Sequence, residues 1–115
     1  MANGNVCRYH AVSNAPSYSI LAALYDRVMS HVQYHQWYNL IRRVAKKYLA
    51  GKQTLSLFEI GAGTGILGQM LREADYAYLG SDYCFEMCRQ ATRARIREIC
   101  VDGRALPLCT AFDMI

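Results

Sequence analysis

The chain has 115 residues, a hydrophobic content of 53%, a charged content of 19% and a formal net charge of +4. This length allows one domain at most, and the composition predicts a globular chain and excludes an intrinsically disordered one. No apolar run approaches the roughly 20 residues that a membrane span needs, and the N-terminus lacks the basic and apolar blocks of a secretory signal. We therefore expect a cytoplasmic protein with no membrane partner, whose mild positive charge permits an anionic partner without requiring one.

The cysteines form neither a metal-binding nor a disulfide pattern. The chain has five, an odd number, and no two of them show C-x-x-C spacing. No histidine lies where a zinc ligand set would need it. We therefore expect reduced thiols and no metal site, with Cys84 and Cys88 buried on a helix as small hydrophobic residues.

Two leading helices are predicted in residues 17–50, after an irregular polar lead-in over residues 1–16. Apolar residues recur at helical spacing from Leu21 to Val32 and again from Tyr34 to Leu49. The second helix is expected to end at Gly51, with lysines in its last turn, where cations suit the helix dipole. Its outer face carries the basic residues Arg42, Arg43, Lys46 and Lys47.

Residues 51–115 alternate between strand and helix patterns, which predicts an α/β fold with a parallel sheet and right-handed crossovers. The predicted strands are residues 55–60, 76–81 and 99–101, with the start of a fourth at 112–115. The helix after the first strand is expected to end near Ala74. The helix after the second strand is expected to place Phe85, Cys88, Ala91 and Thr92 on its inner face.

A glycine-rich turn joins the first of these strands to its helix, with glycines at positions 61, 63 and 65. Glycines cost conformational entropy, so a fold keeps three of them in five residues only where side chains would obstruct. The helix that opens at Ile66 offers unpaired N–H groups and a positive dipole end. The turn therefore predicts a site where backbone approaches a nucleotide-like ligand.

Acidic residues fall at or near the carboxyl ends of the predicted strands, where ligands of open α/β sheets bind. These residues are Glu59, Asp82 and Asp102. Asp82 follows Gly61 by about 20 residues, a spacing that places a carboxylate to accept the hydroxyls of a ribose. Because this chemistry serves any adenosine ligand, Asp82 alone does not separate one cofactor from another.

A group of arginines follows Asp82, at Arg89, Arg93, Arg95 and Arg97. They are consistent either with a solvated helix face, which we favour, or with a contact for nucleic acid.

The spacing Glu59-x-Gly61-x-Gly63-x-Gly65 resembles motif I of the class I S-adenosylmethionine (SAM)-dependent methyltransferases. The dinucleotide fingerprint G-x-G-x-x-G/A instead needs its third small residue one position after Gly65, where this chain has Ile66. The stretch from Gly80 and Asp82 through Met87 to Ala91 resembles the second motif, with Cys84 in place of the usual serine. Three further stretches resemble parts of the family: the leading helices from Tyr25-Asp26 to Trp37, the third motif from Asp102-Gly103 to Leu108, and the start of the fourth at Phe112-Asp113-x-Ile115.

The resemblance covers residues 25–115 and implies a partial Rossmann-like class I methyltransferase fold. Such a fold would have about three and a half parallel strands with flanking helices, after two N-terminal helices, with residues 51–115 as the cofactor-binding half. The same resemblance implies that Asp82 holds the ribose and that Tyr83 lies near adenine. It also implies that Asp102 accepts the exocyclic amine of adenine and that the backbone N–H after Asp102 contacts the adenine ring. The implied SAM-binding residues are Tyr25, Glu59, Gly61, Ala62, Gly63, Asp82, Tyr83, Asp102 and Gly103.

The function implied by the resemblance is SAM binding and, in the complete protein, methyl transfer to an acceptor. A small-molecule acceptor is favoured, although nothing in the residues separates it from protein or RNA. No catalytic residue is identified, because in the family such residues usually come from beyond the fourth strand. We expect the 115-residue chain alone to be inactive and to self-associate. The alternatives are a non-catalytic adenosine-cofactor-binding fragment that acts through protein contacts and an NAD-type nucleotide-binding domain.

Overall fold

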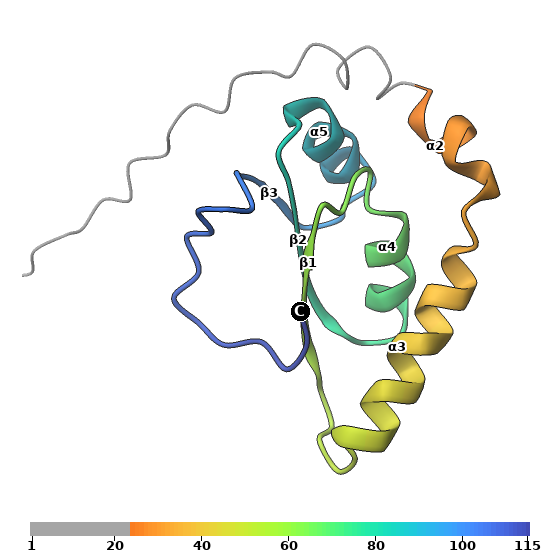
Figure 1. Cartoon of the computed structure of the whole chain (residues 1–115), viewed down its shortest axis with the longest axis vertical. Coiled ribbons are helices and arrows are strands. Elements are labelled where there is room, and N and C mark those ends of the chain that lie inside the picture. The colour runs from red at the N-terminus through yellow and green to blue at the C-terminus, as the bar shows by residue number, and fades with distance from the viewer. Residues whose placement is uncertain (1–23) are drawn as a thin grey trace, which may run out of the picture.

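The computed structural model describes residues 24–115, which form a three-stranded parallel sheet with helices against one face (Figure 1). The strands are β1 (Ser56–Ile60), β2 (Ala77–Asp82) and β3 (Glu98–Cys100), in the order β1-β2-β3. Each pair of neighbouring strands runs parallel, with Ser56 opposite Ala77 at the start of the first pair. The predicted lead-in over residues 1–16 lies outside the described residues.

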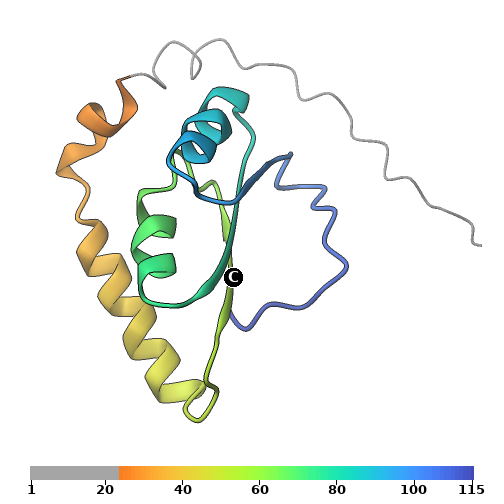
Figure 2. The ribbon, with the colours of Figure 1, turned by 180° about the vertical axis from the view of Figure 1, so that it is seen from behind.

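The two crossover helices are α4 (Ile66–Glu73), between β1 and β2, and α5 (Phe85–Arg93), between β2 and β3. Right-handed crossovers that step in one direction across a parallel sheet place their helices on the same face. Figures 1 and 2 show α4 and α5 on that face, with the long helix α3 (Tyr34–Tyr48) beside α4. The predicted α/β fold and the alternation of strand and helix are confirmed.

The fourth strand is present as a single parallel bridge between Met114 and Leu57, on the free side of β1. The N–H of Phe58 donates to the carbonyl of Met114 at 3.0 Å. The carboxylate of Asp113 accepts hydrogen bonds from the N–H of Ser56 at 2.7 Å and from its hydroxyl at 2.9 Å, and it pairs with Lys52. Hydrogen bonds from Lys52 and Ser56 lower the pKa of Asp113 to about 2. Asp113 therefore fixes its own segment to the start of β1, and we call its contact with Ser56 the clasp.

The leading helices differ in detail from the expected pair. Helix α2 covers only Tyr25–Val28 and continues as a 3-10 turn, η1 (Met29–His31). The chain then becomes extended at Val32, with ψ of 125°, before α3 begins at Tyr34. The two helices are therefore separated by a break at Val32 and Gln33. Leu21, where the helical pattern begins, lies outside the described residues.

The core lies between the sheet and the helices, where Leu57, Leu71, Tyr78, Ala91 and Ile96 form one buried cluster. Helix α4 approaches β2 so closely that a Cβ added at Gly68 would lie 2.4 Å from the ring of Tyr78. Such a distance leaves no room for a side chain at Gly68. This glycine, which the sequence patterns did not single out, sets the separation between α4 and the sheet.

The inner face of α5 differs from the prediction, in which Phe85 and Thr92 point inward. Phe85 is 49% exposed and Thr92 is exposed, so their predicted burial was wrong. The buried residues are instead Cys84, Met87, Cys88 and Ala91. These positions follow one helical stripe, and Phe85 lies at its edge.

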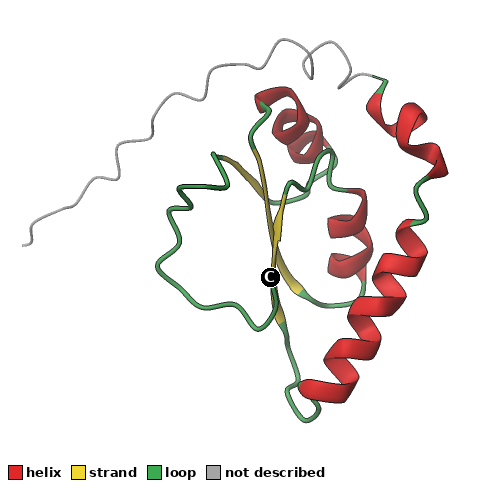
Figure 3. Cartoon of the chain, in the orientation of Figure 1, coloured by secondary structure: helices red, strands yellow, loops and turns green. Residues whose placement is uncertain are grey.

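The opposite face of the sheet carries the segment 101–113, which contains no helix or strand (Figure 3). Phe58 projects toward this segment and is fully buried there, with the ring of Phe112 at a centroid distance of 5.3 Å. Ile60, two residues further along β1, is 52% exposed. The two faces are thus covered unequally, by packed helices on one side and by a single loop on the other.

Candidate functional site

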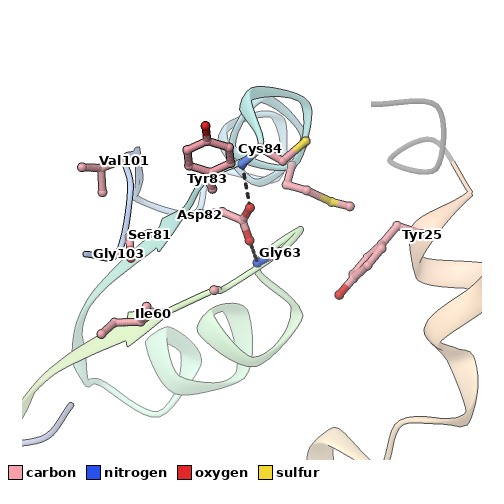
Figure 4. Close-up of a pocket in the computed structure, with 11 residues that line it drawn as sticks. Tyr25, Ile60, Gly63, Ser81, Asp82, Tyr83, Cys84, Val101 and Gly103 are labelled. Carbon is pink, nitrogen blue, oxygen red and sulfur yellow. Dashed lines mark hydrogen bonds between the residues drawn. The ribbon is translucent and has the colours of Figure 1, made fainter. Parts of the chain in front are cut away.

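A cleft of about 380 Å³ lies at the carboxyl end of the strands, between the glycine turn after β1 and the turn after β2 (Figure 4). Its position agrees with the rule that ligands of open α/β sheets bind beyond the strand ends. The residues that line it are Tyr25, Ile60, Gly61, Gly63, Ser81, Asp82, Tyr83, Cys84, Met87, Val101 and Gly103.

The glycine turn has the backbone conformation that its sequence predicts. Gly61, Gly63 and Gly65 have φ values of 75°, 64° and 84°, in the left-handed region that side chains rarely adopt. The N–H groups of Gly61 and Ala62 both donate to the carbonyl of Ser81 at 2.8 Å, which holds the turn against β2. No atom lies within 4 Å of a Cβ built on Gly61, so the backbone there faces open space.

Asp82 joins the two sides of the cleft. Its Oδ2 accepts the N–H of Gly63 at 2.9 Å, and its Oδ1 accepts the N–H of Cys84 at 2.8 Å, as the dashed lines in Figure 4 show. Cys84, the N-cap residue of α5, makes no side-chain cap, and the carboxylate of Asp82 instead accepts the backbone N–H of Cys84 itself. Each carboxylate oxygen keeps acceptor capacity for a donor on a ligand.

Helix α2 closes the third side of the cleft. The ring of Tyr25 extends toward the glycine turn, and a Cβ added at Gly63 would lie 3.2 Å from its Cε1 atom (Figure 4). The hydroxyl of Thr64, which is buried, donates a hydrogen bond to the carboxylate of Asp26. This bond ties α2 to the turn and places Tyr25 over it.

Two of the predicted site residues, Glu59 and Ala62, do not line the cleft. Glu59 faces the helix side of the sheet, where it accepts a hydrogen bond of 2.7 Å from the hydroxyl of Tyr78. Burial raises the pKa of Glu59, and the hydrogen bond from Tyr78 opposes that change. Ala62 contributes its N–H to the turn.

Asp102 also lies outside the cleft lining, although its neighbour Gly103 belongs to it. The guanidinium of Arg104 contacts both carboxylate oxygens of Asp102, with Nε at 3.0 and 3.1 Å and Nη2 at 2.5 Å. These hydrogen bonds lower the pKa of Asp102 to about 2. The carboxylate is therefore ionised and paired within its own loop.

Sequence reasoning did not include five of the lining residues among the predicted site residues, namely Ile60, Ser81, Cys84, Met87 and Val101. Four of them, Ile60, Ser81, Cys84 and Val101, lie directly beside a residue that was predicted. Extending the predicted set by one residue on each side would have found these four. Met87 is one helical turn beyond Cys84, so its place follows from the buried stripe of α5.

Glu98 lies beneath the cleft, on β3. Both of its carboxylate oxygens are buried and have no hydrogen-bond partner in the described part of the chain. A Cβ built on Gly65 would lie 3.2 Å from its Oε1 atom, and one built on Gly80 would lie 2.8 Å from its Cγ atom. Burial, with the nearby carboxylates of Asp82 and Glu59, raises the pKa of Glu98 to about 8. This residue is therefore mostly protonated at pH 7.

The described residues hold no group of three or more histidine, cysteine, aspartate or glutamate side chains that could bind a metal ion. Within the same range, no helix has both the length and the apolar character to cross a bilayer.

The described residues adopt a Rossmann-like fold of the kind found in class I methyltransferases, with a parallel sheet, a glycine turn after β1 and Asp82 at the end of β2. No family model matches the chain, and no curated protein does. Among solved structures, it is similar to an S-adenosylmethionine-dependent methyltransferase from Clostridium acetobutylicum, with a TM-score of 0.65 and 23% identity over 85% of this chain and 42% of that one. It is also similar to the plantazolicin methyltransferase BpumL in complex with a triazolic desmethylPZN analogue and SAH, with a TM-score of 0.65 and 16% identity over 87% and 41% of the two chains. The chain thus spans less than half the length of these proteins, and at these identities the likeness establishes the fold.

Proposed function

We propose that this chain binds SAM in the cleft and forms the cofactor-binding half of a SAM-dependent methyltransferase. The observation that carries this proposal is the position of Asp82, whose carboxylate links the glycine turn to the start of α5 at the floor of the cleft. BpumL, which shares the fold, was solved with SAH, the demethylated form of this cofactor.

The residues of the cleft fit an adenosine cofactor. The volume of about 380 Å³ lies within the range of about 300–1,000 Å³ that ligand clefts occupy. The open space at Gly61 lets a ligand approach the backbone, and Asp82 offers oxygens with spare lone pairs to ribose hydroxyls. The ring of Tyr83, at the mouth of the cleft, is available to lie beside a flat base.

When bound, SAM supplies a methyl group that its sulfonium already activates. The task of this chain is then to orient the cofactor and to keep water away from it. Asp82 would hold the ribose, the glycine turn would accept the cofactor against its backbone, and Tyr25 would cover it from α2. The role of Asp102 toward adenine remains a prediction, since Arg104 occupies that carboxylate and would have to share it.

The activity of the whole protein is part of the same proposal. Methyl transfer to a small-molecule acceptor is favoured because α2 and α3 resemble the leading helices of small-substrate enzymes.

The described cysteines are unpaired, and Cys84 and Cys88 are buried, which suits a reducing compartment and supports a cytoplasmic location. Glu59 and Ala62 would act from behind the turn, as residues that shape it.

Titration calorimetry with SAM, SAH and NAD tests the proposal. We expect binding of SAM or SAH in preference to NAD, and a loss of about 1–3 kcal/mol for Asp82→Ala, since the ribose loses a charged acceptor. Glu73→Ala is the matched control, because it removes an exposed carboxylate of α4 outside the cleft. Preferred binding of NAD would support the dinucleotide alternative. Equal SAM affinities of the folded wild type and Asp82→Ala would remove Asp82 from the site.

The 115-residue chain alone is proposed to self-associate and to lack methyl transfer. An apolar groove of about 630 Å³ runs beside the free edge of β1 and includes Trp37, Leu40, Val44, Met114 and Ile115. Trp37 is 57% exposed and Ile115 is 79% exposed, so the groove presents apolar surface to water. Apolar surface beside the edge of β1, which is paired by a single bridge to Met114, favours contact with a second copy.

Light scattering and a methyl-transfer assay over a panel of acceptors test this part. We expect oligomers that dissociate in the double variant Trp37→Ser/Leu40→Ser. Tyr48→Ser is the control, because Tyr48 is 68% exposed on the same helix and lies outside the groove. A monomer that turns over an acceptor would contradict the proposal. Binding without turnover in a complete protein would instead support the non-catalytic alternative.

A further inference from the structure

The charges on α3 are unevenly distributed. This helix carries Arg42, Arg43, Lys46 and Lys47 and contains no aspartate or glutamate. Arg43 and Lys46 form no ion pair with any carboxylate in the described part of the chain. Their charge is therefore not neutralised by the fold itself, and it is available to a partner.

Several of these cations converge on a groove of about 520 Å³, which we call the cationic groove. It lies between the second half of α3, the turn that follows this helix, and Tyr76, the residue before β2. Its charged residues are Arg42, Arg43, Lys46 and Lys52. An adjoining hollow of about 330 Å³ shares Arg42, Lys52 and Tyr76 with the groove and adds Tyr38 and one acidic residue, Asp75.

The cationic groove is separate from the cofactor cleft. Lys52 and Leu55, which line the groove, come directly before β1, whereas Ile60 and Gly61, which line the cleft, come at its end. The two hollows therefore lie at opposite ends of the sheet. Figure 1 shows the turn after α3 at the bottom of the molecule and the glycine turn between β1 and α4 in its upper part.

The groove combines cations with aromatic and aliphatic surface. The guanidinium of Arg42 lies 5.6 Å from the centroid of the Tyr38 ring, so it is already stacked on an aromatic face. The ring of Tyr76 and the side chains of Leu49 and Leu55 form an apolar part of the wall. Arginine forks and lysines bind phosphate, and aromatic rings accept the faces of unpaired bases.

We propose that the cationic groove binds single-stranded nucleic acid. Arg43 and Lys46 would contact phosphates, and Tyr76 with its aliphatic neighbours would receive a base. A duplex would present its phosphates but keep its bases stacked, so the apolar wall would have no partner. An acidic peptide would pair with the cations and would likewise leave the ring and the leucines unused.

Fluorescence anisotropy on the 115-residue chain tests the proposal, with a short labelled oligouridylate, the matching oligodeoxythymidylate and a polyglutamate peptide of equal charge as probes. We expect binding of the two oligonucleotides and weaker binding of the peptide. The double variant Arg43→Gln/Lys46→Gln should lower oligonucleotide affinity by at least about fivefold and reduce the slope of log affinity against log salt by about 1.4, or about 0.7 for each phosphate contact.

The control is Arg93→Gln/Arg97→Gln, which removes the same charge from exposed positions at the end of α5 and just before β3, outside the groove and beside the opposite edge strand of the sheet. This variant should keep nearly all of the oligonucleotide affinity. Tyr76→Leu, which keeps the apolar wall but removes the ring, should weaken the oligonucleotides and leave the peptide unchanged. Equal losses in the two double variants would show that net charge alone is responsible and would overturn the proposal. Equal or tighter binding of polyglutamate would overturn it in favour of an acidic protein partner.

Discussion

Two regions of this molecule depend on glycine, and they do so for opposite reasons. In the turn after β1, Gly61 has a positive φ and open space around it, so a side chain would be strained but would touch nothing. In α4, Gly68 has a helical backbone that any residue adopts, but the ring of Tyr78 fills the space of its side chain. The turn therefore leaves room for a ligand, whereas the α4–β2 contact uses its room for packing. Substitutions in the first region should affect binding most, and those in the second should affect stability.

The largest effect is expected in the turn. Gly61→Val or Gly63→Val should reduce SAM affinity by more than about 100-fold, or about 2.7 kcal/mol, because a branched side chain would occupy the space where the ligand meets the backbone. Calorimetry on folded protein measures this loss. Gly51→Val is a matched control, since Gly51 has φ of 94° and no atom near its Cβ position, but lies far from the cleft. The Gly51→Val variant has the same backbone strain and should keep its SAM affinity. Normal SAM binding by either turn variant would contradict the proposed difference between the two glycine regions.

A smaller effect, on the stability of the fold and not on ligand affinity, is expected for Gly68→Ala. Helix propensity alone predicts a gain of about 1 kcal/mol. The clash with Tyr78, whose ring is buried and whose hydroxyl is held by Glu59, predicts a loss of about 1–3 kcal/mol from overpacking. We expect the loss to exceed the gain, as measured by urea unfolding. Gln69→Ala, at an exposed position of the same helix, controls for propensity. A Gly68→Ala variant more stable than the wild type would show that α4 can move away from the sheet.

A pH-dependent effect is expected at Glu98, whose side chain lies close to both regions at Gly65 and Gly80. Its pKa of about 8 in the folded protein exceeds the value of about 4.3 in an unfolded chain. The folded state therefore binds the extra proton between these values. The contribution to stability is complete below about pH 4 and is lost as the pH rises through 8.

The urea concentration at the midpoint of unfolding, compared between pH 5.5 and pH 8, measures how stability depends on pH. This dependence should be weaker in Glu98→Gln than in the wild type. Asp102 and Asp113, with pKa values of about 2, titrate below this window. Burial raises the pKa of Cys88 and Cys100, so their unfolded thiols, with a pKa of about 8.5, contribute only at the upper edge of this window. An identical pH dependence in both proteins would assign the effect to another group, such as Glu59.

The sequence predicted the elements whose signals are local. Strand β1, the glycine turn and α4 follow from hydrophobic period and glycine spacing, and the lining of the cleft by Gly61, Gly63 and Asp82 follows from strand ends. The orientation of Asp102 was not predictable in this way, because its pairing depends on where the side chain of Arg104 folds. Gly68 was missed because a glycine inside a helix has no pattern of its own, and its role depends on a tyrosine of a strand that follows α4. The inward face of α5 was predicted wrongly because its buried stripe begins at Cys84, which precedes the helix, and not at Phe85.

The clasp between Asp113 and Ser56 has a consequence for the order in which the molecule assembles. Its two residues are 57 positions apart, whereas the partners in the β1–β2 pair are much closer along the chain. Closing the longer loop costs more chain entropy, so the unit β1–α4–β2 can form first and the clasp closes later. The segment 101–113, which brings Val101 and Gly103 to the cleft, is fixed at its far end by this contact and by those of Phe112 and Met114 with β1, which close loops of similar length. A newly synthesised chain would therefore acquire its glycine turn early and its complete cleft last.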